Sequence, residues 1–205
     1  MTIDSITIEE IAIPFKQSFS HASATRKATE AVLVIAHSNE GHIGYGEGCP
    51  RSYVTGETVA SAQQFFESHQ NGFSKITCLD QLKSWVISNS KAIDDNPAAW
   101  CAIELAILDM LAQEGHQTVE RLLSRPSLAG EFYYTAVLGS EGLEAFAKQL
   151  EQYHQSGFQT YKVKVSGNLN QDREKIALFK NLGRRIEVRL DANNLWEQPE
   201  QAIAY

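Results

Sequence analysis

The stretch Thr160–Asn168, TYKVKVSGN, places two lysines in a segment that otherwise has the pattern of a buried strand. Lys162 and Lys164 alternate with Val163 and Val165. Because side chains at positions i and i+2 of a strand point to the same face, the two lysines share one face and the two valines share the other. Burying an unpaired ammonium group is costly, so the lysine face must meet solvent or acidic partners.

The sequence around this stretch alternates between strand and helix patterns. Strand patterns at residues 132–138, 160–165 and 185–191 are each followed by a helical pattern, and Gly157 and Gly183 suit the ends of the first two helices. Such alternation predicts a parallel sheet with right-handed crossovers. It is typical of an open doubly wound sheet and of a (β/α)8 barrel. No glycine-rich nucleotide-binding motif follows any of the strands, which argues against nucleotide binding.

Two interpretations of the lysine face are open. In a β/α layer the valines suit the face that helices cover, so the lysines would point into a barrel interior, near the end of the strand where active sites of this architecture lie. Alternatively, the strand lies at a sheet edge and its lysines are solvated guards against edge pairing. Asp191 favours the first interpretation, because a carboxylate at the end of the next strand is well placed to bind a divalent cation. Asn193 follows two residues later, and the simpler alternative for Asp191 is a turn cap.

The first 50 residues have a different pattern, that of an antiparallel meander. Apolar and polar residues alternate at residues 5–15, and a β-branched run covers residues 30–38. A turn at residues 39–41 then leads into a glycine-rich strand at residues 42–48. The polar, small-residue-rich stretch 16–29 between the first two strands predicts a mobile loop. These segments therefore predict an antiparallel sheet that precedes the β/α region.

Helical patterns follow the predicted meander. Thr55 is expected to cap a helix that has Glu57 in its first turn, and a second helix is expected at residues 79–89. Asn96 suits the N-cap of an alanine-rich helix that is apolar nearly all round and that Gly115 would end. A helix of that composition is normally buried on several sides, so we expect it at the centre of this region.

Composition excludes several classes of protein. The net charge of −7 argues against nucleic acid, which selects basic surfaces. Cys49, Cys78 and Cys101 are odd in number and widely spaced, which indicates neither a zinc site nor a disulfide framework and predicts single buried or half-buried thiols. The N-terminus lacks the pattern of a signal peptide, and no apolar run approaches the roughly 18 residues of a membrane helix. We therefore expect a soluble, cytoplasmic protein.

Four stretches, in this order and at matching intervals, give the chain a family resemblance. They are GHIGYGEGCPRSYVTGET, AIELAILDMLAQ, GFQTYKVKVSG and RLDANNLW. Together they resemble the N-terminal portion of the enolase superfamily, and within it the muconate-lactonizing subgroup of cycloisomerases, o-succinylbenzoate synthases and dipeptide epimerases. The resemblance runs through nearly the whole chain. It implies an α+β capping domain at residues 1–130, an antiparallel meander plus helices, followed at residues 131–205 by the first three β/α units of a (β/α)8 barrel.

The resemblance also implies roles for the residues at the strand ends. Lys164 would be the acid/base catalyst. Lys162 would lie beside it, favour the neutral amine that a base requires and help to neutralise the substrate carboxylate. Asp191 would be the first of three carboxylate ligands to Mg²⁺, and Asn193 a nearby polar contact.

Further residues are expected to touch the substrate on the same grounds. The loop Ser18–Arg26, which includes His21, and the segment Cys49–Thr55 would fold over the barrel mouth and select the substrate. For their individual side chains the alternative is a solvated loop. The predicted substrate-binding residues are Asn193, Arg26, Arg51, Tyr53 and Thr135.

The implied activity is Mg²⁺-dependent removal of the alpha proton of a small-molecule carboxylate through an enediolate. A metal that holds the carboxylate oxygens stabilises the developing charge, and a Lys base with Mg²⁺ is a known pattern of the superfamily. We expect a racemase or epimerase, by resemblance one that acts on dipeptides. The alternatives are an o-succinylbenzoate synthase, then a cycloisomerase, and, from another class, a truncated non-catalytic binding or assembly module.

The length of the chain departs from the family pattern. A complete barrel has eight β/α units in typically about 250 residues, whereas about three units follow residue 131. The second and third metal ligands and the opposing lysine of the family would lie on later strands. We therefore expect the chain to be part of a longer enzyme, since its end falls in the opening turns of a helix, and to work as a homo-oligomer or with a companion C-terminal segment.

Overall fold

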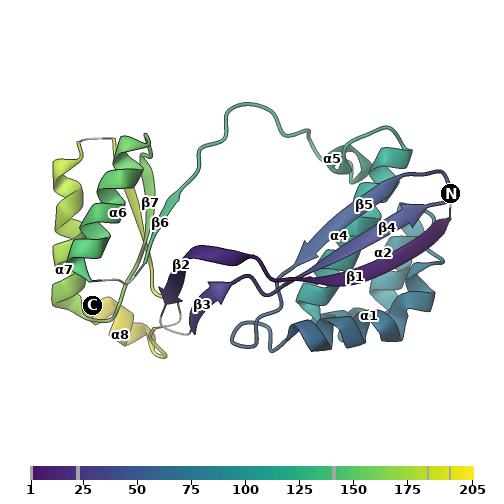
Figure 1. The fold of residues 1–205 in the computed structure, drawn as a ribbon, viewed down its shortest axis with the longest axis horizontal. Coiled ribbons are helices and arrows are strands. Elements are labelled where there is room, and N and C mark those ends of the chain that lie inside the picture. The colour runs from purple at the N-terminus through teal and green to yellow at the C-terminus, as the bar shows by residue number, and fades with distance from the viewer. Residues whose placement is uncertain (1, 22–23, 140–141, 184, 194) are drawn as a thin grey trace. The chain divides into compact units, whose positions relative to one another are not determined.

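The computed structural model describes residues 2–21, 24–139, 142–183, 185–193 and 195–205, with the side chains of residues 17–25 outside the description. The chain forms two compact units (Figure 1). The first comprises Met1–Pro14 and Ala28–Ala129, and the second comprises Phe15–Lys27 and Gly130–Tyr205. In the part of the chain that the structure covers, no helix has both the length and the apolar character that a membrane span requires.

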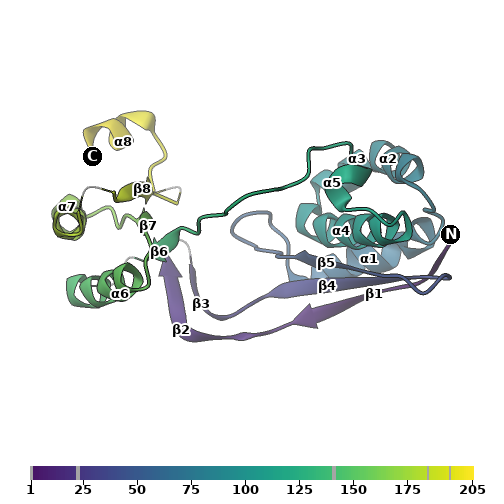
Figure 2. The ribbon, with the colours of Figure 1, turned by 90° about the horizontal axis from the view of Figure 1, so that it is seen from above.

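The first unit is built on an antiparallel sheet of β1 (Ile3–Ile11), β4 (Ala31–Ser38) and β5 (Ile43–Gly48), in the order β1-β4-β5. This is the meander that the sequence predicts. Helices α1 (Val59–Phe73) and α4 (Pro97–Glu114) lie on one side of the sheet (Figure 2). Alternating strand residues such as Val32 and Val34 are fully buried against these helices, as period-two patterning requires.

Three shorter helices complete the first unit. They are α2 (Leu79–Ser88), α3 (Ser90–Asp94) and α5 (Val119–Leu122). The core also contains a cluster of aromatic rings, in which the Trp85 and Trp100 rings stack with their centroids 4.6 Å apart. The alanine-rich helix α4 is the central element, as its composition predicts, with ten of its residues buried.

Three glycines let α4 approach the backbone of β5. A Cβ added to Gly44, Gly46 or Gly48 would lie 2.0, 2.0 or 2.2 Å from a backbone carbonyl oxygen of α4. Side chains of the same helix bind the backbone of β5, since Tyr45 donates its N–H to Asp109 Oδ2 at 3.0 Å and Gln113 Nε2 donates to the carbonyl of Ile43 at 2.7 Å. The helix therefore covers backbone groups that an open strand edge would expose.

Two expectations for this region are corrected by the structure. The stretch at residues 16–29 is largely a two-stranded hairpin of β2 (Pro14–His21) and β3 (Ala24–Ala28), and not a loop. Its pairing is a property of the backbone, and its polar sequence lacks the apolar alternation by which strands are recognised. The three cysteines are free and exposed, and not buried, because each lies at a position that faces away from the core.

The start of α1 also differs from its prediction. Thr58 is the N-cap, not Thr55, and it forms a capping box with Ser61 through two reciprocal backbone-to-side-chain hydrogen bonds of 2.9 and 3.1 Å. Glu57 therefore precedes the helix and does not lie in its first turn. Its carboxylate is bound elsewhere, at the N-terminus of α4.

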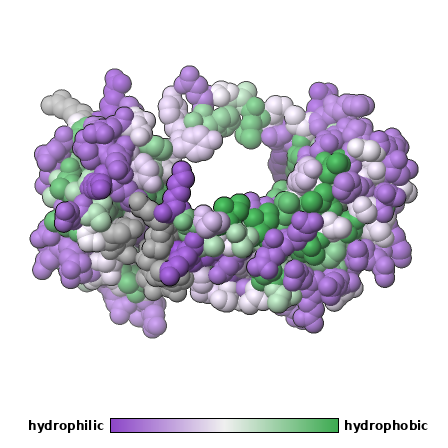
Figure 3. Space-filling view, viewed as in Figure 1, coloured by the Kyte–Doolittle hydropathy of each residue, from purple (hydrophilic) through white to green (hydrophobic). Residues whose placement is uncertain are grey.

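The second unit contains a parallel sheet in the order β6-β7-β8, formed by β6 (Ala136–Leu138), β7 (Thr160–Lys164) and β8 (Glu187–Asp191). Helices α6 (Leu143–Gln155) and α7 (Leu169–Leu178) lie on the same side of this sheet (Figure 2). The predicted β/α alternation is confirmed, although β6 is shorter than the strand expected at residues 132–138. Hydrophilic side chains cover most of the visible surface of α6 and α7 (Figure 3).

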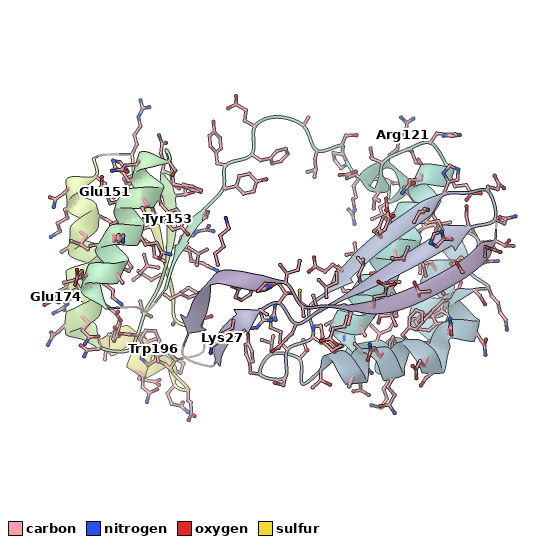
Figure 4. The ribbon with its side chains drawn as sticks, in the orientation of Figure 1. Lys27, Arg121, Glu151, Tyr153, Glu174 and Trp196 are labelled. Atoms are coloured by element: carbon pink, nitrogen blue, oxygen red, sulfur yellow. The ribbon has the colours of Figure 1, made fainter. Side chains whose placement is uncertain are left out.

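A second core lies between this sheet and its helices. Tyr161 and Val163 of β7 are at most 1% exposed, and they pack with Phe146 of α6 and with Phe179. Phe179 begins a short 3-10 helix, Phe179–Asn181, that continues α7. After β8 the chain turns into α8 (Pro199–Ala204), and Trp196, which Figure 4 labels, precedes this helix in the sequence. The centroid of its ring lies 4.8 Å from the centroid of the Tyr205 ring. Trp196 is thus a packing residue.

Candidate active site

The two lysines of β7 lie on the face of the sheet opposite to its helices. Tyr161 and Val163 point into the core with α6 and α7, so Lys162 and Lys164, which alternate with them, point to the other face. Strand β7 is hydrogen-bonded to β6 on one side and to β8 on the other. Because β7 is the central strand of its sheet, the edge-strand interpretation of its lysines is wrong.

Both ammonium groups meet one carboxylate oxygen at the end of β8. The sheet register pairs Lys164 with Asp191. Lys164 Nζ lies 3.0 Å from Asp191 Oδ2, and Lys162 Nζ lies 3.2 Å from the same oxygen. The structure therefore brings together the three charged residues that the sequence singled out, in an arrangement that we call the Lys-Asp-Lys cluster.

Asn193 completes the surroundings of this cluster. Its backbone has a φ of 46°, in the left-handed region that Asn tolerates better than most residues. This conformation lets the Asn193 N–H donate to Asp191 Oδ1 at 3.1 Å, while Lys164 Nζ donates to Asn193 Oδ1 at 2.6 Å. Asp191 thus caps its turn with one oxygen and pairs with the lysines through the other, so the turn-cap interpretation holds, and metal binding by Asp191 stays a prediction.

The side chains of the Lys-Asp-Lys cluster are partly buried, and their opposite charges compensate the cost of that burial. The side chain of Lys164 is 9% exposed, that of Asp191 27% and that of Lys162 38%. Partial burial by itself would raise the pKa of Asp191, but hydrogen bonds from Lys164, from the Asn193 N–H and from Lys162 outweigh that effect and hold the pKa below its ordinary value. The carboxylate is therefore ionised at neutral pH.

Asp191 fits one position of a divalent-metal site, as a hard and ionised oxygen ligand at a strand end. Within the ranges that the structure describes, no group of three His, Cys, Asp or Glu side chains is placed to hold a metal ion. The described residues therefore offer one candidate ligand, Asp191, and not a complete metal site.

A further charged residue of the same face, Arg189, was not identified from the sequence. It lies two residues before Asp191 on β8, so the two side chains share a face, and it is paired in register with Lys162. Its Nη2 donates to Thr135 Oγ1 at 2.8 Å. The i, i+2 spacing from Asp191 was the available signal, and it would have placed Arg189 on the lysine face.

Thr135 lies at the other end of the sheet from the Lys-Asp-Lys cluster. It directly precedes β6, and its hydroxyl lies 3.4 Å from that of Thr160, the first residue of β7. Lys164 is four residues further along that strand, which corresponds to about 13 Å at the usual rise per residue. The structure does not bring Thr135 to the cluster.

The remaining predicted substrate contacts lie in other segments. Arg26, in β3, has its guanidinium carbon 5.8 Å from the centroid of the Phe15 ring. Arg51 and Tyr53 belong to the first unit, where Tyr53 is 39% exposed and Arg51 Nη1 is buried with no hydrogen-bond partner among the residues described. The loop Ser18–Arg26 includes residues 22 and 23, which lie outside the described ranges, as does the side chain of His21.

Comparison with known proteins gives relatives along nearly the whole chain. No family model matches it. The chain is 27% identical to a hydrophobic dipeptide epimerase of Enterococcus faecalis over 99% of its length and 56% of the relative's. It is 28% identical to an N-succinyl-L-Arg/Lys racemase of Bacillus cereus and to an L-Ala-D/L-Glu epimerase of Bacillus subtilis, each over 99% of this chain and 55% of the relative. The chain thus spans about half the length of the curated relatives that it matches.

Solved structures give the same result. A substrate-liganded L-Ala-D/L-Glu epimerase from Bacillus subtilis matches all of this chain and 56% of its own, with a TM-score of 0.88 and 26% identity. A dipeptide epimerase from Enterococcus faecalis, complexed with Mg and the dipeptide L-Leu-L-Tyr, matches all of this chain and 57% of its own, with a TM-score of 0.81 and 27% identity. A muconate lactonizing enzyme complexed with muconolactone, from Mycobacterium smegmatis, matches with a TM-score of 0.87, 25% identity, and coverage of 100% and 56%.

The fold and the sequence together give the class of protein that this chain resembles. It is similar to the N-terminal portion of enolase-superfamily enzymes, with an α+β sheet-and-helix unit followed by three β/α units. The relatives that it matches are dipeptide epimerases and an N-succinyl-L-Arg/Lys racemase.

Proposed function

We propose that this chain contributes the base and one metal ligand to an enzyme that epimerises dipeptides by removing the proton alpha to a carboxylate. The single observation that supports it most is the Lys-Asp-Lys cluster at the carboxyl end of β7 and β8. Active sites of (β/α)8 proteins are built at that end of the strands. The relatives named as epimerases extend the argument from the site to the substrate class.

In this proposal Lys164 removes and returns the alpha proton. Its Nζ is held by two oxygens, Asp191 Oδ2 at 3.0 Å and Asn193 Oδ1 at 2.6 Å. The position of the amine is therefore fixed before the reaction begins. Lys162 adds a second positive charge within reach of the same carboxylate oxygen, where it favours an anionic substrate carboxylate. The charge of these residues thus suits a proton abstraction that increases negative charge on the substrate.

Asp191 would hold Mg²⁺ together with ligands from outside the described residues. When bound, the cation would supply stabilisation of negative charge on the substrate carboxylate. Relatives complexed with Mg and a dipeptide support this cofactor.

The test is exchange of the alpha proton with solvent deuterium, followed by proton NMR of dipeptides such as L-Ala-D-Glu and L-Leu-L-Tyr in the presence of Mg²⁺. The protein is prepared as its gene encodes it. Replacing Lys164 by Ala should lower the rate of exchange by about 10²–10⁴-fold, the usual contribution of a general base. Lys148→Ala, an exposed lysine on α6, is the matched control and should exchange at the wild-type rate. Exchange retained in Lys164→Ala excludes Lys164 as the base.

A cycloisomerase is the second candidate, because the muconate lactonizing enzyme shares the fold across this whole chain. Conversion of muconate without exchange of any dipeptide would favour it over the epimerase. The cytoplasmic location and the homo-oligomeric state expected from the sequence remain predictions.

A further inference from the structure

A buried carboxylate that the proposed chemistry does not use lies beside the strand of the proposed base. Asp172, in the first turn of α7, is 5% exposed. Its Oδ2 accepts the Ser166 N–H at 2.8 Å, and its Oδ1 accepts the Ser166 hydroxyl at 3.1 Å. The hydroxyl of Tyr205 also donates to Oδ2, and burial together with this hydrogen bond raises the pKa of Tyr205 to about 12, so the donor keeps its proton at neutral pH. Three hydrogen bonds thus satisfy the buried group.

These bonds close the turn that follows β7, at residues 165–168. Ser166 lies two residues after Lys164, and its Oγ also accepts the Asn168 N–H at 3.2 Å. Asn168 is the N-cap of α7. The carboxylate of Asp172 therefore fixes the whole turn on the first turn of the helix.

Lys164 depends on this turn because the sheet holds it on one side alone. The ladder between β6 and β7 includes Lys162 and ends at Val163. Lys164 is the last residue of β7, and among the described residues it is paired with Asp191 of β8 and with no residue of β6. Two neighbouring strands therefore hold the backbone of Lys162, whereas one strand and the turn hold that of Lys164.

The turn holds Lys164 through the two peptide groups that follow it. The Val165 N–H donates to the carbonyl of Asp191 at 3.1 Å, and the next N–H, that of Ser166, donates to Asp172. The first bond fixes the strand end on β8, and the second fixes it on α7. Because the place of an ammonium group follows that of its backbone, a shift of the strand end displaces Lys164 Nζ, and a misplacement of about 1 Å can slow a reaction about 10²-fold.

We propose that Asp172 is a positioning residue, which anchors the turn after β7 and thereby holds Lys164 in the geometry for removal of the alpha proton. This inference rests on the proposed function. Asp172 lies in the helix layer, does not touch the reacting atoms and acts through Ser166. Lys162 lies within the ladders of both neighbouring strands and keeps its place without the anchor. Loss of the anchor therefore slows proton transfer and leaves the binding of the substrate carboxylate intact.

The first experiment compares amide hydrogen exchange in Asp172→Ala and in the wild type, with the protein prepared as its gene encodes it. Without the carboxylate the Ser166 N–H loses its acceptor, so exchange at Ser166 should become about tenfold faster or more, while Val163 keeps its protection. Asp172→Asn retains a side-chain oxygen for this N–H and should stay close to the wild type. The control is Glu174→Ala, an exposed residue of the same helix, which should leave both amides unchanged (Figure 4).

The second experiment is kinetic and follows the alpha proton of a dipeptide. For Asp172→Ala we expect kcat per folded molecule to fall about tenfold or more with KM within about twofold, as for an interaction that acts only in the transition state. Asp172→Asn should recover kcat to within about threefold of the wild type. Ser166→Ala loses the hydroxyl and keeps the N–H bond, so its kcat should lie between those of Asp172→Ala and the wild type. A purely structural residue would lower the amount of folded enzyme and leave kcat per folded molecule alone.

The two experiments test the anchor and its role in catalysis separately. Unchanged exchange at Ser166 in Asp172→Ala overturns the anchor, and faster exchange spread evenly over the second unit makes Asp172 a general stability residue and also overturns it. A loosened turn with an unchanged kcat overturns the positioning of Lys164. If Asp172→Ala does not fold, Ser166→Ala decides, and a wild-type kcat in that variant overturns the inference. A loosened turn in a protein whose wild type exchanges no alpha proton overturns the proposed function and the positioning role with it, while Asp172 remains the anchor of the turn.

Discussion

At the scale of the residue, Asp191 divides its two oxygens between two tasks. Oδ1 accepts the Asn193 N–H and fixes the turn, whereas Oδ2 balances the charges of Lys162 and Lys164. The two tasks can be separated by substitution, because Asn retains an oxygen for the turn and lacks the charge. Lys164 depends most on that charge, since its side chain is only 9% exposed.

Replacing Asp191 by Asn should therefore destabilise the fold. Two ammonium groups would remain close together without a counter-charge, and the free energy of unfolding should fall by about 1–3 kcal/mol. Urea denaturation measures this. The control is Asp95→Asn, which breaks a Lys91–Asp95 pair of 3.1 Å whose side chains are 89% and 63% exposed. That pair is worth at most about 1 kcal/mol, and equal losses in the two variants would contradict the expectation.

The pairing of Asp191 with Lys162 and Lys164 also makes the free energy of unfolding depend on pH. The pKa of Asp191 in the folded protein lies below its ordinary value of 3.8, so over this range the unfolded chain binds more protons at Asp191 than the folded one. The stabilisation is fully present above the ordinary value and is lost as pH falls through the lower folded pKa. The difference in free energy of unfolding between wild type and Asp191→Asn should shrink from about pH 5 downward. A difference that stays constant to pH 2, in urea titrations at each pH, would exclude this origin.

At the scale of the element, the close packing of β5 against α4 depends on glycine, which has no Cβ, at three positions of the strand. A Cβ on Gly46 would lie 2.0 Å from the carbonyl oxygen of Ala102 and 2.6 Å from the backbone nitrogen of Ala106. Backbone atoms in a helix cannot rotate away as a side chain can. The strand and the helix would have to separate, and the hydrogen bonds that Asp109 and Gln113 make to β5 would lengthen.

Gly46→Ala should consequently lower the free energy of unfolding by about 3 kcal/mol, at or above the upper end for overpacked sites, which thermal unfolding can measure. Gly142→Ala is the matched control, since the added Cβ meets nothing within 4 Å there. Because Gly142 is the N-cap of α6, where Ala is disfavoured, this control should lower the free energy of unfolding by at most about 1 kcal/mol. A Gly46→Ala variant as stable as this control would show that α4 can move aside.

At the scale of the whole molecule, the sequence allowed prediction of those features that repeat along the chain. The alternation in TYKVKV placed both lysines on one face, and the β/α repeat gave the parallel sheet. Asp191 was recognised because it ends a strand, and Asn193 because it follows closely. These are local patterns, which a single sequence contains in full.

What could not be predicted depends on partners that are distant in sequence. Glu57 binds the start of a helix 41 residues away, so a local rule placed it in the first turn of α1. Asn96 is the N-cap residue of α4, as predicted, but its side chain makes no capping hydrogen bond. The β2–β3 hairpin has a polar sequence without the apolar alternation by which strands are recognised. The role of Arg189 depends on Thr135, its hydrogen-bond partner 54 residues earlier, which the local sequence around β8 does not contain.

The three glycines of β5 have a genetic consequence. Every single-base change in a glycine codon that replaces glycine by another amino acid adds at least a Cβ, and at Gly44, Gly46 and Gly48 that atom would fall within 2.2 Å of a backbone oxygen. No amino-acid replacement at these codons is conservative. The strand at the centre of the GYGEG motif can therefore drift only at its odd-numbered positions, and a random mutagenesis library selected for folded protein should return wild-type glycine at every second codon.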